Sequence, residues 1–337
     1  MSNYLSRRKF LRNASLAGTG LLLSNQIYAS FRNDLLKQKG IQVGAITYSF
    51  RSLPGSAEDI LKYCLQSGIS SIELMGDPAE AFAGSPAGLM PPMGPRPGGT
   101  PPSGAPAAGT PPTDFRKMME ERNQKAKPWR ETVGMEKFEE LRKMYNKAGV
   151  TIYAYKPNAL NESSSDKEID YAMTAARALG ATSVTVELPA NAAHSKRLGE
   201  FATKHKVYVG YHAHTQATDT AWDQALAQSP YNSMNLDCGH YIAAGGNNTK
   251  ESLLALIVAK HDRITSMHLK DRKKKENGGT NVPWGTGDTP IVEILQLMKK
   301  NKYTFPASIE LEYEIPEGSD AVKEVSKCVA YARQALK

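Results

Sequence analysis

The feature that most constrains this chain is an alternation of two kinds of segment, repeated eight times. Short apolar runs rich in β-branched residues, typical of strands, occur at 41–47, 69–74, 149–154, 181–188, 206–211, 233–237, 264–270 and 305–311. Segments with the periodicity of amphipathic helices follow them at 56–67, 135–147, 165–179, 193–204, 218–228, 249–260, 289–301 and 318–336. Strand-then-helix units of this kind predict parallel strands joined by right-handed crossovers.

Two α/β architectures accommodate such units: a closed (β/α)8 barrel and a doubly wound open sheet. A glycine-rich fingerprint after the first strand would favour the open sheet, and this sequence has none there. Eight strands of similar length close most naturally into a barrel, and the active site of a barrel lies at the carboxyl ends of its strands. We therefore predict one barrel domain over residues 31–337.

One segment departs from the alternation. Residues 84–113 contain ten prolines and seven glycines in thirty positions. Such a composition supports neither helix nor strand, so we expect a solvated, polyproline-like insertion. Because it follows the second strand, it would emerge at the carboxyl end of the barrel. A linker without a catalytic role and a flap or subunit contact are both open.

The first thirty residues have the organisation of an export signal. A basic start containing Arg7 and Arg8 precedes a short apolar run over 14–23 and a small-residue site ending at Ala29. The paired arginines resemble a twin-arginine signal, so we predict cleavage near Ala29 and a periplasmic mature protein. The alternative is a short amphipathic helix. No apolar run reaches 18 residues, so no transmembrane helix is expected.

The net charge argues against a nucleic-acid or membrane partner. The formal charge is +8, but four basic residues and no acidic residue lie in the predicted signal, which leaves +4. Residues 270–276 carry +3 of that excess, so no broad basic face remains for a duplex. The three cysteines, at positions 64, 238 and 328, lack the spacing of a zinc motif or a disulfide framework.

Polar and charged residues gather where the predicted strands end. They are Glu73, Lys156, Glu187, His212, His214, Asp237, His240, His268, Lys270 and Glu310. Barrel strands are buried on both faces and should be apolar throughout, and an unpaired buried charge is costly. A shared ligand is therefore indicated, and a mixed oxygen and nitrogen set suits one Mn, Mg, Co or Fe ion. The alternative is a buried polar network without a ligand. Glu312 is expected to be a solvated rim charge.

Four short stretches resemble one known family. They are residues 235–240 (NLDCGH), 267–271 (MHLKD), 284–288 (WGTGD) and 309–312 (IELE). Together they are similar to the motifs of the sugar phosphate isomerase/epimerase family, whose fold is a xylose isomerase-like TIM barrel. The resemblance covers nearly all of the chain after the signal except the proline-rich insertion. It implies one divalent metal ion, Mn, Mg or Co, held by two glutamates, an aspartate and a histidine.

Three of the implied ligands fall on matching motifs, namely Asp237, His268 and Glu310. His240 falls where that family has a histidine that contacts the substrate or supports the metal. The second glutamate is replaced at its usual place on the fifth strand by His212. We expect Glu187 on the neighbouring strand to be the fourth ligand, since a carboxylate keeps the charge that a hard cation favours. The alternative is His212 itself.

The resemblance implies an isomerase or epimerase that abstracts a proton next to a sugar carbonyl and stabilises the enediolate with its metal. The catalytic candidates are Glu187, Glu310, His212, His214 and Lys156, and the substrate-binding candidates are Glu73, His240, Lys270 and Trp284. The lysines would supply positive charge to the enediolate oxygen, unless they are ordinary rim lysines. Trp284 would stack on a sugar ring, unless it packs in the core.

Three alternatives remain open, and the first two share a small carbohydrate partner. If a leaving group lies β to the abstracted proton, the same first step leads to elimination, as in a 3-keto-glycoside lyase or hydratase. A non-catalytic exported sugar-binding protein would not need a complete metal set. A nuclease on this fold needs further histidines on the second and third strands, where this sequence has Glu73 and Lys156. Homo-oligomerisation is also open.

Overall fold

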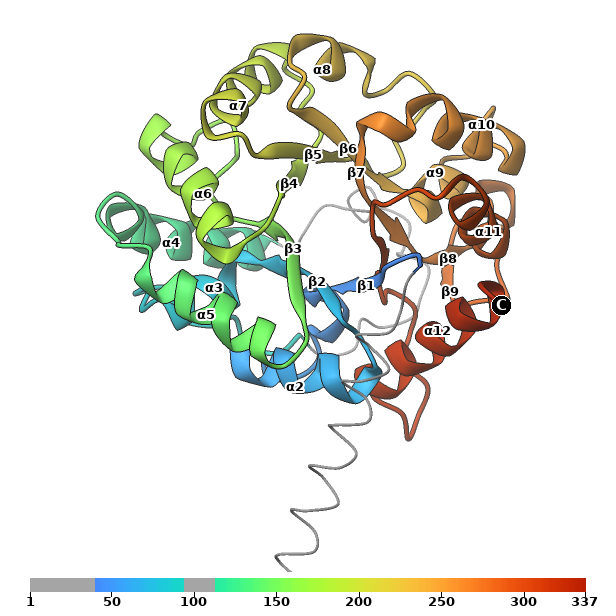
Figure 1. Cartoon of the computed structure of the whole chain (residues 1–337), viewed down its shortest axis with the longest axis horizontal. Helices are drawn as coiled ribbons and strands as arrows, with labels where there is room; N and C mark the ends of the chain where they lie inside the picture. Colours follow the sequence, from blue (N-terminus) through green and yellow to red (C-terminus); the bar gives the residue numbers. More distant parts are fainter. Residues whose placement is uncertain (1–39, 94–112) are drawn as a thin grey trace, which may run out of the picture. The chain divides into compact units, whose positions relative to one another are not determined.

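The computed structural model describes residues 40–93 and 113–337, and its centre is a closed barrel of eight parallel strands. The strands are β1 (Val43–Ile46), β2 (Ser71–Met75), β3 (Thr151–Lys156), β4 (Ser183–Glu187), β5 (Tyr208–His212), β6 (Asn232–Asp237), β7 (Ile264–Leu269) and β10 (Ala307–Ile309). Their order is β1-β10-β7-β6-β5-β4-β3-β2, so the last strand pairs with the first. Figure 1 shows the strands at the centre and the helices outside them. The predicted (β/α)8 barrel is confirmed.

Eight helices correspond to the predicted ones. They are α2 (Ala57–Ser67), α5 (Glu136–Lys147), α6 (Asp166–Leu179), α7 (Ala192–His205), α8 (Asp223–Gln228), α10 (Lys250–Lys260), α11 (Ile291–Asn301) and α12 (Ala321–Ala335). The Ser56 side chain caps α2 by accepting a hydrogen bond from the Asp59 N–H at 3.0 Å. Helix α8 begins five residues later than expected. The preceding turn instead buries Trp222, whose indole N–H donates to the Tyr211 carbonyl at 2.8 Å.

Within residues 40–93 and 113–337, three further α-helices are present that the sequence analysis does not predict: α3 (Gly76–Phe82), α4 (Thr113–Arg130) and α9 (Cys238–Ala244). Helix α4 is fixed to α3 by Arg130, whose guanidinium donates to both carboxylate oxygens of Glu80 at 2.8 and 3.0 Å. Helix α9 follows β6 directly. It begins there because the Asp237 side chain accepts a hydrogen bond from the His240 N–H at 2.6 Å.

Short elements complete the described residues. They are the 3-10 helices η1 (Thr47–Phe50), η2 (His261–Arg263) and η3 (Lys275–Asn277), and a two-stranded antiparallel ribbon of β8 (Asp271–Arg272) and β9 (Asn281–Val282). Residues 84–93 of the insertion form turns and segments without regular structure, and its last residue, Thr113, begins α4. The predicted signal at 1–30 and residues 94–112 lie outside the described residues. Within 40–93 and 113–337, no helix is long and apolar enough to cross a membrane.

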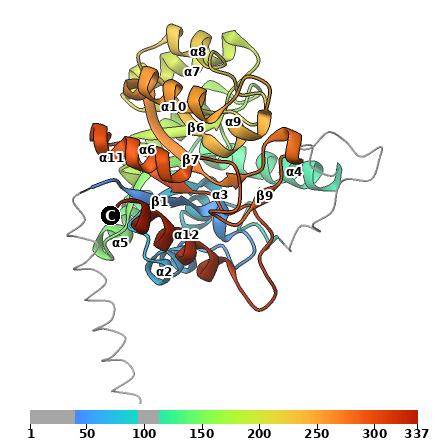
Figure 2. The ribbon, with the colours of Figure 1, turned by 90° about the vertical axis from the view of Figure 1, so that its right-hand side faces the viewer.

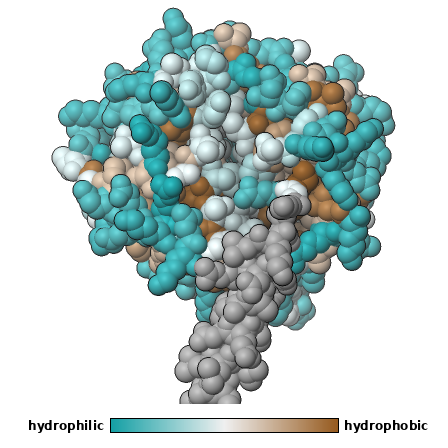
Figure 3. Space-filling model, viewed as in Figure 1, coloured by the Kyte–Doolittle hydropathy of each residue, from teal (hydrophilic) through white to brown (hydrophobic). Residues whose placement is uncertain are grey.

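The barrel wall separates an apolar layer from a polar interior. Ile72, Leu74 and Val184 are fully buried and belong to the apolar core. Buried polar side chains are also found on the strands, namely Glu73, Thr185, Asn235, Ser266 and His268. The face seen in Figures 1 and 3 is hydrophilic around its rim and near neutral towards its centre. Figure 2 shows α4 on the side opposite the start of β1, which is the carboxyl-end side of the barrel.

Candidate active site

The candidate site lies at the carboxyl ends of neighbouring strands. His212 and Asp237 are the last residues of β5 and β6, His268 is the penultimate residue of β7, and Glu310 directly follows β10. The strand register sets Asp237 opposite His268. The structure thus brings together four side chains that come from separate segments of the sequence.

Three of these side chains are arranged so that they could hold one metal ion, and together with Glu310 they are called the metal group below. A ligand atom from each of His212, Asp237 and His268 lies within 4.8 Å of the other two, and all three residues are buried. Glu310 adds a carboxylate oxygen 3.2 Å from His268 Nδ1. Asp237 Oδ2 and His268 Nδ1 are buried without a hydrogen bond of good geometry, as expected of atoms that share a cation. A donor set of two imidazoles and two carboxylates fits a divalent transition metal.

Glu73 lies inside the barrel and supports His268. Its Oε2 is 2.8 Å from His268 Nε2, and both side chains are buried. Glu73 Oε1 accepts a hydrogen bond from Thr185 at 2.6 Å, and Glu73 Oε2 accepts one from the Asn235 amide at 3.1 Å. These contacts turn Nδ1 of His268 towards Asp237 and the metal group. We predicted that Glu73 binds substrate. In the structure the side chain is fully enclosed by the barrel and its carboxylate contacts His268, Thr185 and Asn235, which favours a supporting role.

Asn235 supports His212 in the same way. The Asn235 amide donates to Glu73, so its carbonyl oxygen is left to face His212 Nδ1 at 3.2 Å. The imidazole Nε2 is then available to the metal group. Burial lowers the pKa of His212 to about 4, so its ring is neutral at pH 7, as a ligand must be. Burial also acts to lower the pKa of His268, but Glu73 and Glu310 outweigh it and raise that pKa to about 10. A metal ion bound at Nδ1 of His268 would therefore have to displace a proton.

Lys270 brings a positive charge into the same group. Its Nζ lies 3.0 Å from Asp237 Oδ2, 2.6 Å from Glu310 Oε2 and 2.7 Å from Glu312 Oε2. Burial acts to lower the pKa of Lys270, but these carboxylates raise it, so the ammonium is charged. Lys270 is 2% exposed and is therefore not a rim lysine. Glu312 is not a solvated rim charge either, because it accepts one of the hydrogen bonds of this ammonium.

Glu187 lies apart from the metal group. Its Oε1 is 2.9 Å from Lys156 Nζ, and its Oε2 is 3.6 Å from His214 Nε2. The ammonium of Lys156, on the adjacent strand β3, is the nearer cation and holds this carboxylate. Burial acts to raise the pKa of Glu187, but Lys156 and the two histidines lower it well below its usual value. The structure therefore groups His212, and not Glu187, with Asp237 and His268.

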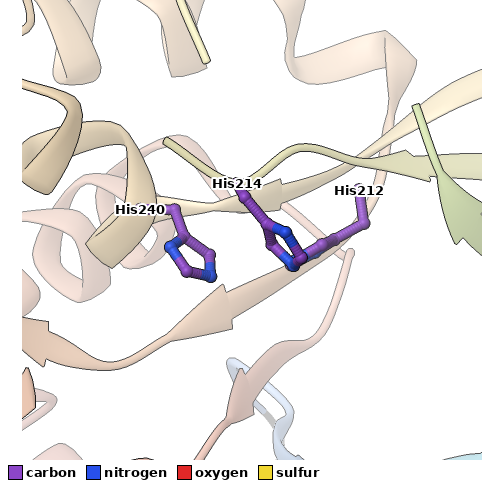
Figure 4. Close-up of side chains that lie close together, drawn as sticks. All are labelled: His212, His214 and His240. Carbon is purple, nitrogen blue, oxygen red and sulfur yellow. The ribbon is translucent and has the colours of Figure 1, made fainter. Parts of the chain in front are cut away.

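Three histidines form a second cluster at the mouth of the site. The rings of His212, His214 and His240 have centroids 4.6 to 5.7 Å apart, and Figure 4 shows the rings of His214 and His240 next to each other. Lys270 Nζ lies 3.0 Å from one ring nitrogen of His240, and the Arg272 guanidinium lies 2.5 Å from the other. Lys270 faces both groups, but the histidine cluster holds no carboxylate that would balance a second cation, so it suits a metal ion less well than the buried group does.

The chain matches a known protein family over most of its length. Residues 114–331 match the profile of the xylose isomerase-like TIM barrel family, and this stretch holds six of the eight barrel strands. The chain belongs to this family. No curated protein matches the chain.

Solved structures with the same fold include three enzymes. A sugar phosphate isomerase/epimerase from Parabacteroides distasonis is 16% identical, with a TM-score of 0.54 over 89% of this chain and 97% of that one. A 3-keto-D-glucoside 4-epimerase from E. coli is 11% identical, with a TM-score of 0.54 over 87% and 99%. A D-psicose 3-epimerase from Clostridium cellulolyticum is 12% identical, with a TM-score of 0.54 over 88% and 100%. At these identities the likeness concerns the fold.

In this xylose isomerase-like barrel, three further predicted site residues, Lys156, Glu187 and Trp284, lie outside the metal group. Lys156 and Glu187 line a cavity of about 380 Å³. Trp284 packs edge-on against Tyr331 of α12, with ring centroids 5.9 Å apart. The N–H groups of residues 285–287 then donate to Asp271 Oδ2 at 2.8 to 3.2 Å. The WGTGD stretch therefore holds the chain after β7, and its tryptophan has a packing role.

The sequence analysis missed two supporting residues, Thr185 and Asn235. Both are buried and contact Glu73. A signal for Asn235 was present, because it lies two residues before Asp237 on the same strand and so faces the same side. An amide at an inward position of a buried strand indicates a hydrogen-bond partner there.

Proposed function

We propose that this protein is a metal-dependent enzyme that isomerises or epimerises a sugar by moving a proton next to a carbonyl. The observation that carries the proposal is the buried group of His212, Asp237 and His268 at the carboxyl end of the barrel. Glu73 and Asn235 orient the two imidazoles from below, as supporting residues do around metal centres.

We propose His212, Asp237, His268 and Glu310 as the ligands of one divalent ion. Two imidazoles with two carboxylates suit Mn, Co or Fe better than Mg, which prefers oxygen ligands. When bound, the ion would polarise the substrate carbonyl and neutralise the charge that develops on its oxygen. Burial acts to raise the pKa of Glu310, but the ammonium of Lys270 and the ring of His268 lower it, so this carboxylate is ionised, which is the form that binds a metal.

His214 is our candidate for the group that moves the proton. It is half-exposed, and its ring centroid lies 5.0 Å from that of His212. Its Nε2 is 3.6 Å from Glu187, whose carboxylate is in turn held by Lys156. A fixed carboxylate beside an imidazole orients the ring, which suits a group that takes and returns a proton.

The names of two neighbours support a sugar substrate. One is an epimerase of a 3-keto-D-glucoside and the other an epimerase of D-psicose. A 3-keto-glycoside lyase or hydratase is our second candidate. It is favoured by the single glutamate in the ligand group, because proton exchange between two metal-bound glutamates needs a second one.

The test is incubation of the metal-loaded protein in D2O with keto-sugars and 3-keto-glycosides, followed by NMR. Deuterium entry at one carbon, with the rest of the molecule intact, is the expected result. Release of the aglycone would assign the lyase instead. The Asp237→Asn and His268→Gln variants should bind less metal, as measured by plasma mass spectrometry. A wild-type protein that binds no divalent metal and exchanges no proton would reject both candidates in favour of a binding protein.

We also propose that residues 1–30 export this protein through the twin-arginine route. The supporting feature is the pair Arg7 and Arg8 ahead of a short apolar run. Replacing both arginines by lysine should keep the protein in the cytoplasm. Mass spectrometry of the periplasmic fraction should find a mature N-terminus near residue 30, and an intact N-terminus there would contradict the proposal.

A further inference from the structure

Two cavities adjoin one another at the carboxyl ends of β1 to β4. The first has a volume of about 380 Å³ and contains Lys156 and Glu187 of the candidate site. The second has a volume of about 400 Å³ and lies over the end of β1 and the start of α3. They share four lining residues, namely Asp77, Phe115, Met119 and Asn158. The two cavities therefore lie side by side.

The second cavity is apolar. Thirteen of its eighteen lining residues are aliphatic, aromatic, methionine or proline, and its two charged residues are Arg51 and Asp77. Both charges already have partners. The Arg51 guanidinium donates to the Leu311 carbonyl at 2.5 Å, and Asp77 accepts from Arg122 at 3.0 Å. A sugar placed here would leave hydroxyl groups without hydrogen bonds, whereas an apolar group would lose nothing.

The outer wall of this cavity is fixed in place. It is formed by residues 89–93, from the described part of the proline-rich insertion. At one end, the Arg122 guanidinium holds the wall by donating to the carbonyls of Ala87 at 2.8 Å, Gly88 at 2.9 Å and Leu89 at 3.2 Å. At the other end, the Met93 N–H donates to the Arg51 carbonyl at 2.7 Å. These bonds hold the wall across the end of β1.

We infer that the second cavity is a subsite for an apolar substituent of the substrate, so that the natural substrate is a carbohydrate bearing an aryl or similar apolar group. This inference rests on the proposed function. The sugar would occupy the first cavity, with its reacting carbon turned towards Glu187 and the neighbouring His214, and the substituent would lie in the second. The methionines in the wall suit aryl groups of various shapes, because their side chains are flexible and polarisable.

The test compares two probes that differ only in the substituent, phenyl β-D-glucopyranoside and methyl β-D-glucopyranoside, by isothermal titration of the full-length protein. Burial of a phenyl ring predicts about 10–100-fold tighter binding of the phenyl compound. The Met90→Glu variant places a charge in the subsite only and should remove this preference. Val258→Glu on α10, where the native side chain is 48% exposed, is the matched control and should retain it. Circular dichroism checks the fold of both variants.

Each outcome decides the inference. Equal affinity for the two glucosides, no measurable binding of the phenyl compound, or a preference that survives Met90→Glu would overturn it. Turnover separates it from the proposed function. Deuterium exchange into methyl and phenyl 3-keto-glucosides at equal kcat/KM would support the proposed enzymatic function and reject the apolar subsite. Tighter binding of the phenyl compound, without deuterium exchange into any keto-sugar, would support the apolar subsite and reject the proposed enzymatic function.

Discussion

Glu73 Oε2 lies 2.8 Å from Nε2 of His268, with both side chains buried inside the barrel. This contact fixes the imidazole from below and directs its other nitrogen at the metal group. A carboxylate behind a ligating histidine raises the basicity of the ring and holds its orientation. The site is therefore organised from within the barrel as well as at its rim.

Replacing Glu73 by glutamine should weaken metal binding about 10–100-fold, because the amide keeps the volume but loses the charge that orients His268. Metal titration measures the effect. Glu324→Gln is the matched control, since Glu324 is also buried and hydrogen-bonded, to Tyr313 at 2.9 Å, but lies on α12. Metal affinity that is lowered equally in both variants would contradict the specific role.

Two further variants test whether His212 or Glu187 is the fourth metal ligand. His212→Ala should lose most of the bound divalent metal, because it removes a buried donor from the group. Glu187→Gln should retain the metal and lower turnover instead, because its carboxylate contacts Lys156 and His214. Metal content and kcat, measured on the same preparations, separate the two effects. The opposite pattern would restore Glu187 as the ligand.

Gly239, at the start of α9, leaves no room for a side chain. A Cβ there would lie 2.4 Å from Lys270 Cγ and 2.7 Å from the Lys270 backbone oxygen. Gly239→Ala should therefore destabilise the protein by about 1–3 kcal/mol and displace Lys270 from the site. Gly55→Ala is the control, since a Cβ at that position meets nothing within 4 Å. Denaturant unfolding compares them, and equal stability of the two variants would contradict the prediction.

The Arg130–Glu80 ion pair fixes α4 to α3 with both side chains almost fully buried. Arg130→Ala should lower the free energy of unfolding by about 3–5 kcal/mol, because it leaves Glu80 buried without its partner. The exposed pair of Lys137 and Glu140 offers the comparison, and Lys137→Ala should cost at most about 1 kcal/mol. A small effect of Arg130→Ala would show that α4 is not held by this pair.

Asp170 on α6 predicts a dependence of stability on pH. Partial burial acts to raise its pKa, but hydrogen bonds from Lys204 and His205 of α7 lower it below the ordinary 3.8. The folded state therefore favours the ionised form, and this stabilisation is complete above pH 3.8 and is lost as the pH falls further.

Asp170→Asn should thus lower the free energy of unfolding at pH 7 by about 0.2–1 kcal/mol, a small effect because the pair is partly exposed. Urea unfolding across a pH series measures the difference from the wild type, which should shrink below pH 3.8. A difference that stays constant down to pH 2 would contradict this origin.

The strands were easier to predict than the helices that depend on contacts between segments. Each barrel strand is a run of apolar and β-branched residues, a signal that is local in the sequence. Helices α3 and α9 are seven residues long and carry little periodicity of their own. Helix α9 owes its start to a side chain of β6, and α4 is anchored by Arg130 on Glu80, fifty residues earlier in the chain.

The sequence by itself determined the eight-fold alternation, the order of the strands and the strand ends at which Asp237, His268 and Glu310 gather. These follow from periodicity and from the rule that parallel strands of a barrel end on one side. Only the tertiary structure decided that His212 lies with Asp237 and His268 while Glu187 contacts Lys156. It also decided that Glu73 contacts His268 from inside the barrel. Side-chain direction across a barrel depends on register and on which opposite charge lies nearest, and neither is written in the local sequence.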